Sequence, residues 1–363
     1  MEPHPSPHLP PVTTSVVRIE RAWYVLATSR ELRGRPLARS LHGTPLVLFR
    51  GADGKPGALL DRCPHRNIPL SDGRVVGSTV QCPYHGWQFD TQGVCRHIPG
   101  HAGIAENKAR NATPYPTMEK DGYVWVWGSP RSEPDGEPYA LPVVDRRYTV
   151  VRYDVVADGS LHQTIENALD VPHTAYLHGG LFRSATSAKH DVKAVITRTK
   201  DRVQAEYVGE PRPPGLVARI LSPQNGVVVH FDRFLLPSIA QVEYHMGGTG
   251  PADADAHFRV TSMCTPVDDF RTKLYAVVQF RVRLVPGFVI TPLVAPIALR
   301  IFAQDAKILA AQTRTIHAFG EERFVSTEID ILGAQILRLM KRAAAGAMGD
   351  DDEAYEKEIT LRI

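Results

Sequence analysis

The sequence predicts an α+β protein of two domains, in which a small all-β domain precedes a larger domain with an antiparallel sheet and a long C-terminal helix. Three observations support this prediction. A chain of 363 residues is long enough to bury two hydrophobic cores. Short alternating apolar segments, separated by turns rich in Gly, Asp, Lys and Pro, fill the first third of the chain. A first helix is expected around Asp170–His178, and helical periodicity returns only near Asp305, after a further series of strand-like segments.

The expected elements follow one another from residue 22 onward. Strands are expected at residues 22–27, 45–50, 58–61 and 123–127 in the first domain, and at 148–155, 191–199, 203–208, 226–232, 257–265 and 274–283 in the second. Helices are expected from Asp305 to the end, and the Pro-rich stretch 130–142 is expected to join the domains. The expected limits are a disordered Pro-rich leader at 1–18, a first domain at 19–145 and a second at 146–363.

The most informative motif is the pair Cys63-Pro-His65 and Cys82-Pro-Tyr-His85, whose two parts are separated by sixteen residues. Two thiolates and two imidazoles are also the ligands of a structural zinc site, which is the alternative. Zinc fingers, however, usually place both cysteines in the first knuckle and both histidines in the second. Here each knuckle carries one of each, as needed if two ligands of each kind are sorted onto the two irons of a [2Fe–2S] cluster. The motif resembles that of Rieske clusters.

A second motif follows downstream, in Asp170-Val-Pro-His173-Thr-Ala-Tyr-Leu-His178. On a helix, residues three to five positions apart fall near one face, so these side chains are expected to converge. Two imidazoles and a carboxylate that leave coordination positions open form the facial triad of non-heme Fe(II) oxygenases. Together the two motifs resemble the catalytic α-subunit (terminal oxygenase) of Rieske non-heme iron oxygenases.

The resemblance implies a Rieske [2Fe–2S] domain followed by a helix-grip (START-like) catalytic domain that holds a mononuclear Fe(II). The implied cluster ligands are Cys63, His65, Cys82 and His85, and the implied iron ligands are His173, His178 and Asp305.

Asp305 is the expected third iron ligand because its D-x-x-I-L-x-x-Q surroundings match the stretch that carries this ligand in the family. Asp330 is the alternative, and it is interpreted as a solvated charge on an amphipathic helix. The family often has an acidic residue before this aspartate, whereas this chain has Gln304.

Two further polar residues acquire expected roles from the resemblance. Asp170 is expected to bridge the iron histidine of one subunit and a Rieske histidine of its neighbour, expected to be His85, and to carry electron transfer between them. Asn167, one turn earlier, is a candidate polar residue near the iron that does not bind it directly. A helix-capping role is the alternative.

The implied activity is insertion of oxygen from O₂ into a substrate, with electrons from NAD(P)H. No G-x-G-x-x-G motif joins a strand to a helix and no plant-type four-cysteine cluster is visible, so a separate reductase, with or without a ferredoxin, is the expected partner. A homotrimer is expected, because Asp170 links neighbouring subunits. The alternatives are dihydroxylation of a small arene and a Rieske electron carrier without catalysis.

The expected substrate is hydrophobic, of sterol, polycyclic or polyketide type. Residues 285–299 run without a charge directly before Asp305 and are interpreted as buried core or as an apolar mouth with peripheral membrane contact. This run is too short and too rich in proline to span a membrane.

Composition narrows the remaining choices. The net charge of +3 gives no reason to expect nucleic acid as a partner. Only four cysteines are present, and Cys95 and Cys264 have no close partner in sequence, so reduced thiols and a cytoplasmic location are expected.

A group of arginines near the iron–sulfur motif is a candidate docking surface for an acidic redox partner. It comprises Arg62, Arg66, Arg74 and Arg96.

Overall fold

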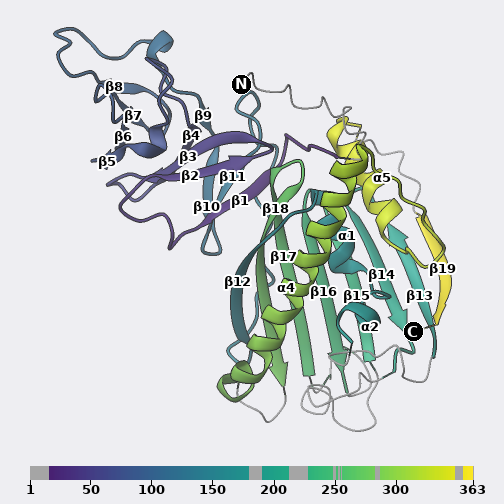
Figure 1. Cartoon of the computed structure of the whole chain (residues 1–363). Helices are drawn as coiled ribbons and strands as arrows, with labels where there is room; N and C mark the ends of the chain where they lie inside the picture. Colours follow the sequence, from purple (N-terminus) through teal and green to yellow (C-terminus); the bar gives the residue numbers. More distant parts are fainter. Residues whose placement is uncertain are drawn as a thin grey trace, which may run out of the picture.

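The structure is a computed structural model. It describes residues 16–179, 190–211, 228–247, 251, 254, 256–282, 287–347 and 355–362, without the side chains of residues 288, 293 and 294. Figure 1 shows a β-rich N-terminal part attached to a larger part, in which one broad sheet is covered by helices. This arrangement confirms the predicted fold class.

The N-terminal part consists of three small antiparallel sheets. The first contains β1 (Trp23–Thr28), β11 (Tyr123–Trp127) and β10 (Thr117–Lys120). The second contains β2 (Leu37–Leu41), β3 (Thr44–Arg50), β4 (Pro56–Leu60) and β9 (Pro114–Tyr115). The third contains β5 (Arg74–Val76), β6 (Thr79–Gln81), β7 (Gln88–Asp90) and β8 (Cys95–His97), with the short turns η1 (Leu70–Asp72) and η2 (Lys108–Arg110) nearby.

Strand β11 explains how the small part is fixed to the large sheet. All five of its residues are buried, because both of its faces are covered. Side chains of successive strand residues point to opposite faces, so Val124 and Val126 pack into one core while Trp125 and Trp127 pack into another. The second core includes Met263 of the large sheet. The two parts of the molecule therefore share apolar packing rather than a loose linker.

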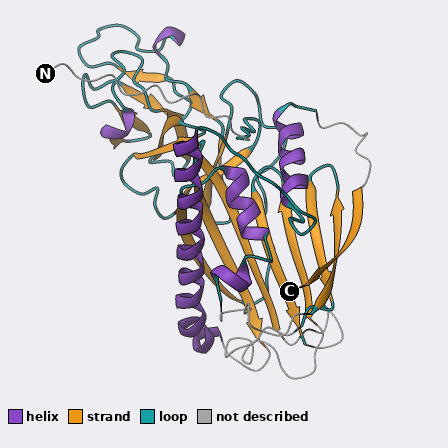
Figure 2. Cartoon of the chain, turned by 45° about the vertical axis from the view of Figure 1, so that its right-hand side comes forward, coloured by secondary structure: helices purple, strands orange, loops and turns teal. Residues whose placement is uncertain are grey.

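The large sheet has eight antiparallel strands in the order β12-β18-β17-β16-β15-β14-β13-β19. Their bounds are β12 (Thr149–Ala157), β13 (Asp191–Arg198), β14 (Arg202–Val208), β15 (Val228–Leu235), β16 (Ile239–Met246), β17 (Ala256–Asp268), β18 (Arg271–Val282) and β19 (Tyr355–Arg362). The helices described beside them are α1 (Leu161–Leu169), α2 (Thr174–Leu177), α4 (Gly287–Phe319) and α5 (Gly333–Ala344). Figure 2 shows the helices gathered on one face of this sheet.

Helix α4 begins well before the position expected from the sequence. The uncharged run at 285–299, interpreted from the sequence as core or an apolar mouth, is helical from Gly287. Pro292 and Pro296 lie inside the helix. Proline removes a backbone N–H and normally disrupts a helix interior. Both prolines lie on the exposed side, where the freed carbonyl groups can be hydrated. Within the described residues no helix is long and apolar enough to cross a membrane.

Other boundaries also differ from the expectation. The C-terminal region is not helical throughout, because β19 follows α5 and pairs with β13. Strand β16 was not expected. Residues 1–15 of the expected leader lie outside the described residues, whereas Val17 packs in the core and Arg18 pairs with Asp269.

Candidate active site

The first candidate centre lies at the tip of the small part, where two loops meet. Cys63 and His65 follow β4, and Cys82 and His85 lie in the loop between β6 and β7. Each loop folds back on itself, because the Cys63 N–H donates to Ile68 O at 2.8 Å and the Cys82 N–H donates to Trp87 O at 2.8 Å. The four side chains predicted as cluster ligands are thus brought together from two hairpin-like loops.

The chemistry of these four groups fits a cluster with two kinds of ligand. Both cysteines are buried, and burial together with the neighbouring Cys82 thiol raises the pKa of Cys63 to about 11. The His65 and His85 rings lie 4.5 Å apart between centroids, and Nδ1 of His65 is buried without a hydrogen-bond partner among the described residues. The donors are therefore available for metal, and metal binding would displace the thiol proton.

Local sequence explains the second centre. Ser160 and Gln163 form a capping box that starts α1, and Pro172 prevents the helix from continuing beyond Asp170. His173 then opens the single turn α2 and His178 closes it. The expectation that Asp170 and both histidines share one continuous helix is wrong, since the proline separates α1 from α2.

Three donor atoms nevertheless converge on one point. His173 Nε2 and His178 Nε2 are 3.2 Å apart, and Asp305 Oδ1 from the middle of α4 lies 3.5 Å and 3.1 Å from them, respectively. Asp305 Oδ1 is buried and has no hydrogen-bond partner among the described residues. Two imidazole nitrogens and a carboxylate oxygen at this separation fit a shared cation, with open positions for other ligands.

In each imidazole, Nδ1, the nitrogen that does not face the converging donors, has a polar neighbour. His178 Nδ1 lies 3.0 Å from Gln304 Oε1, so Nδ1 carries the proton and donates it, and Nε2 keeps its lone pair for the metal. His173 Nδ1 lies 3.3 Å from Asp170 Oδ2. Gln304 was noted in the sequence only as a departure from the family pattern, and its contact with His178 gives it a positioning role.

Electrostatics at this centre favour positive charge. Burial alone would lower the pKa of His173, but the carboxylates of Asp170 and Asp305 outweigh burial and raise the pKa to about 9. Burial would raise the pKa of Asp305, yet the two histidines lower it. The arrangement therefore stabilises a cation among these groups.

The structure does not bring Asp330, the alternative third ligand, to the two histidines. It lies in a turn before α5, not on the amphipathic helix expected from the sequence, and its carboxylate accepts hydrogen bonds from Thr327 N–H and Oγ1. Among the aspartates considered, Asp305 supplies the converging oxygen.

An apolar cavity of about 220 Å³ opens at these donors, between the sheet and α4. His178 and Asp305 form part of its wall, and Asn167 lies at its edge. Its walls are otherwise mainly aliphatic and aromatic, with side chains from α1, α4 and four strands of the sheet. They include Val242, Tyr244, Phe258, Val260, Ile301 and Phe302.

A separate, larger groove of about 750 Å³ lies on the other side of Asp170. It runs between α1, the second half of α4 and residues 319–333, and it does not touch His178 or Asp305. Phe319 and Phe324, which line it, are 78% and 48% exposed, which is unusual for large apolar side chains. The groove is therefore a surface feature adjoining Asp170 rather than a second entrance lined by His178 or Asp305.

A buried histidine between two carboxylates, near the cavity, was missed by sequence reasoning. His230 lies 2.8 Å from Glu210 Oε2 and 3.0 Å from Asp232 Oδ1, and its ring stacks on Tyr244 at 3.9 Å. Burial would lower the pKa of His230, but the two carboxylates raise it to about 9. A charged imidazolium thus backs the Tyr244 ring that lines the cavity.

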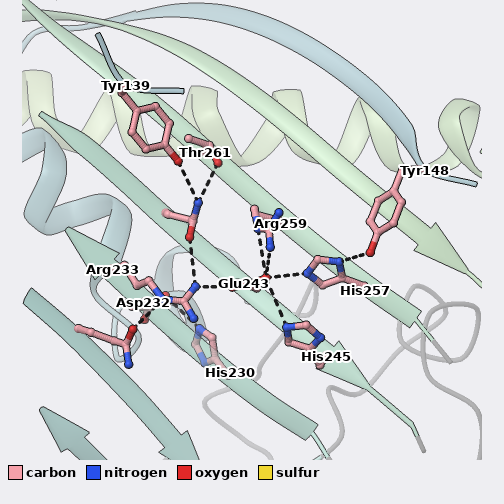
Figure 3. Close-up of polar contacts among 12 residues, drawn as sticks. Tyr139, Tyr148, His230, Asp232, Arg233, Glu243, His245, His257, Arg259 and Thr261 are labelled. Atoms are coloured by element: carbon pink, nitrogen blue, oxygen red, sulfur yellow. Dashed lines mark hydrogen bonds and ion pairs between the residues drawn. The ribbon is translucent and has the colours of Figure 1, made fainter. Parts of the chain in front are cut away.

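Glu243, His245 and His257 form another group with the composition of a metal site. They lie on the opposite face of the sheet, because Val242 and Tyr244 face the cavity and strand side chains alternate. Figure 3 shows that arginine side chains also converge on Glu243, and Arg233 and Arg259 both form ion pairs with it. Two guanidinium groups already neutralise the carboxylate, so this group is a structural ion-pair network rather than a cation site.

The substitution Glu243→Gln tests this assignment. It should destabilise the protein by about 3 kcal/mol, because it leaves two partly buried guanidinium groups without a counter-charge. Iron content should not change. Urea unfolding and metal analysis measure the two effects, and Glu206→Gln on β14, which has no ion pair among the described residues, is the matched control. Loss of bound metal in Glu243→Gln would contradict the structural assignment.

Known proteins match both parts of the chain. The Rieske [2Fe-2S] domain model matches residues 22–108, and the vanillate O-demethylase oxygenase C-terminal domain model matches residues 157–346. The chain is 34% identical to aminopyrrolnitrin oxygenase PrnD of Pseudomonas fluorescens over 296 residues, which cover 74% of this chain and 76% of that protein. It is 40% identical to the oxygenase component of dicamba O-demethylase of Stenotrophomonas maltophilia over 164 residues, which cover 44% of this chain and 48% of that protein.

The fold agrees with the sequence matches. The crystal structure of dicamba monooxygenase bound to dicamba superposes with a TM-score of 0.74 at 27% identity, covering 91% of this chain and 99% of that one. A Rieske domain joined to a sheet-and-helix domain of this kind defines a two-centre iron oxygenase. The chain belongs to the Rieske non-heme iron oxygenases, and its second domain to the vanillate O-demethylase oxygenase C-terminal family.

Family membership settles several alternatives raised by the sequence. The protein uses a Rieske [2Fe–2S] cluster and a mononuclear non-heme iron, and it draws electrons from NAD(P)H through a separate reductase. A zinc site at the first motif and a cluster protein without catalysis are both excluded.

Proposed function

We propose that the protein is a terminal oxygenase that oxidises a single-ring aromatic compound, most simply by removing a methyl group from oxygen. Cys63, His65, Cys82 and His85 would hold the cluster, and His173, His178 and Asp305 the iron. The observation that carries the proposal is the convergence of the three iron donors on the wall of a small apolar cavity.

Cavity size argues for a small substrate. An apolar cavity of about 150 Å³ holds benzene, and pockets for drug-sized ligands begin at about 300 Å³. The cavity of about 220 Å³ therefore suits one substituted ring. It gives no support to the sterol-sized substrate suggested by the apolar run, and Phe288 and Leu293 of that run have side chains outside the described set.

The reaction consumes two electrons and two protons. A methoxyarene, O₂, two electrons and two protons yield a phenol, formaldehyde and water. Iron, when bound at the three donors, would supply O₂ activation. Around it, Gln304 fixes the proton on His178 Nδ1, Asp170 orients His173, and the aliphatic walls from the sheet and α4 exclude water from the reacting ring.

Electrons are proposed to reach the iron from a neighbouring copy. In Figure 1 the strands β5–β8 lie at the upper left of the molecule and the turn α2 at the lower right. Ring formation by head-to-tail contacts, here a homotrimer, would place the exposed His85 of one copy beside Asp170 of the next. The groove next to Asp170 supports that docking, because it carries exposed Phe319 and Phe324 side chains at the point where the cluster would arrive.

The redox partner is proposed to dock near the cluster loops. Arg96 is removed from the expected docking surface, because it already pairs with Asp90 and Glu106 at 2.7 Å and 2.6 Å. Arg62, Arg66 and Arg74 are exposed and remain candidates for steering an acidic reductase or ferredoxin.

The proposed domain limits are 19–145 and 146–363. They are supported by the placement of β1–β11 and β12–β19 in different sheets.

Turnover with a purified partner tests the function. The iron-loaded protein, a reductase and NADH should convert methoxybenzenes of one ring to phenols, with formaldehyde and NADH consumption in about equal amounts. Mass spectrometry and a formaldehyde assay measure the products, and a two-ring or larger methoxyarene is the size control. Efficient oxidation of sterol-sized compounds, with single-ring compounds inert, would overturn the proposal.

A further inference from the structure

Three aromatic rings stack across neighbouring strands of the large sheet. Tyr207 on β14 faces His230 on β15, and His230 faces Tyr244 on β16 in the strand register. The Tyr207 and His230 ring centroids are 4.5 Å apart with the planes 18° from parallel, and those of His230 and Tyr244 are 3.9 Å apart with the planes 12° from parallel. Tyr207 lines the groove next to Asp170 and Tyr244 lines the cavity, so the imidazole lies between a ring of each.

Two carboxylates hold the His230 ring in this stack. Its Nδ1 atom lies 2.8 Å from Glu210 Oε2 and its Nε2 atom lies 3.0 Å from Asp232 Oδ1. All three side chains are at most 2% exposed, so water does not compete for these contacts. Both nitrogens face an acceptor, and a doubly protonated imidazolium satisfies both contacts. Because the ring is held at two of its atoms, it cannot turn without breaking one of these hydrogen bonds.

The imidazolium of His230 in turn orients the Tyr244 ring. A cation on an aromatic face is attracted by the negative charge of that face, and the near-parallel packing covers one face of Tyr244. The part of Tyr244 that lines the cavity is therefore its other face or its edge. Phe258 on β17 faces Tyr244 in the strand register and lines the same cavity. The cavity wall thus includes aromatic surface whose orientation is fixed by His230.

We infer that Tyr244 is the residue that selects for an aromatic ring in the substrate, and that His230, held by Glu210 and Asp232, positions it. The inference rests on the proposed function, because the ring to be bound is that of the proposed methoxyarene. Tyr244 packs against this ring in a stacked or edge-to-face arrangement. His230 acts only through Tyr244, since it lines neither the cavity nor the groove among the described residues.

Anisole and methoxycyclohexane test the selection for an aromatic ring, because the two ethers are similar in size but only anisole is flat. Their binding to the iron-loaded full-length protein and to its Tyr244→Leu variant is measured by isothermal titration calorimetry. The substitution should weaken anisole relative to methoxycyclohexane by about twofold to twelvefold, which is the range for an aromatic pair beyond its buried area. Tyr244→Phe keeps the ring and should keep the preference. An unchanged preference in Tyr244→Leu would overturn the inference.

Val242→Ala is the control for cavity shape. Val242 lies on the same strand, two residues before Tyr244, and lines the same cavity. Its substitution removes apolar surface but no ring, so it should weaken both ethers by a similar factor. A loss of anisole preference as large as that in Tyr244→Leu would show that cavity shape, not the ring, sets the preference, and would refute the role of Tyr244.

The double substitution His230→Gln with Asp232→Asn tests the positioning role. It removes one positive and one negative charge, so the net charge of the cluster is kept, and the new amide at position 230 can still donate to Glu210. The preference for anisole should fall toward that of Tyr244→Leu, while iron content and the Rieske absorbance stay the same. A preference equal to that of the unsubstituted protein would overturn the positioning role. The melting temperature reports whether the variant is folded, and the comparison at Tyr244 does not depend on it.

Failure of the inference can be told apart from failure of the proposed function. If anisole is bound and demethylated but Tyr244→Leu keeps the preference for it, only the inference fails. If anisole neither binds nor reacts while larger compounds do, the proposed function and the inference both fail.

Discussion

His178→Ala is expected to lose one of about three irons per chain and all measurable turnover, while the Rieske absorbance and EPR signals remain. The imidazole is 3% exposed and its Nε2 atom lies within 3.2 Å of both other donors, so no neighbouring group or water can replace it without rearrangement. The loops that carry the proposed cluster ligands adjoin the small N-terminal sheets, not the eight-stranded sheet, and should be unaffected. Iron analysis beside the optical spectrum measures both outcomes.

Asp305→Ala and Asp330→Ala form the matched comparison for the third ligand. The first should behave as His178→Ala does, and the second should keep its iron because Asp330 only caps a turn at Thr327. Full iron content in Asp305→Ala, or iron loss in Asp330→Ala, would show that the proposed ligand set is wrong.

Asp170→Asn is expected to keep both metal centres and to slow their electron exchange by about 100-fold, at the upper end of the effect of a residue that orients a metal ligand. The amide retains the shape of the side chain but loses the charge that raises the pKa of His173. Single-turnover reduction, followed by rapid quenching, measures oxidation of the cluster against product formation.

Glu321→Gln provides the control for Asp170→Asn. Glu321 lines the same groove and is exposed, but it does not contact either histidine of the iron site among the described contacts. Its substitution should leave electron exchange unchanged. If both variants slowed the exchange equally, the effect would come from the overall charge of the groove rather than from a bridge at Asp170.

Local motifs made most of the two centres predictable. The spacing of Cys63, His65, Cys82 and His85 is set within two short loops, and His173 and His178 lie on either side of a single turn. Asp305 is distant in sequence and was found only through family resemblance. Gln304 gave no local signal, because a glutamine on a helix surface is ordinary until its partner His178 is known.

The missed elements have physical reasons. Strand β16 places the polar residues Gln241, Glu243 and His245 on a largely buried face. Polar residues are usually exposed, so the sequence of this segment did not indicate a buried strand. Their partners come from neighbouring strands and were invisible in a single segment. Strand β19 is charged and lies at the sheet edge, where little burial is needed. The start of α4 was hidden by Pro292 and Pro296.

One helix carries both a proposed iron donor and much of the cavity wall. Ile301 and Phe302 of α4 line the cavity, while Gln304 and Asp305, about one turn later, contact His178. A ligand that shifts α4 even slightly must change the affinity for iron. By thermodynamic reciprocity, iron loading then changes the affinity for the ligand by the same factor. Substrate affinities of the iron-free and iron-loaded protein are therefore two different quantities.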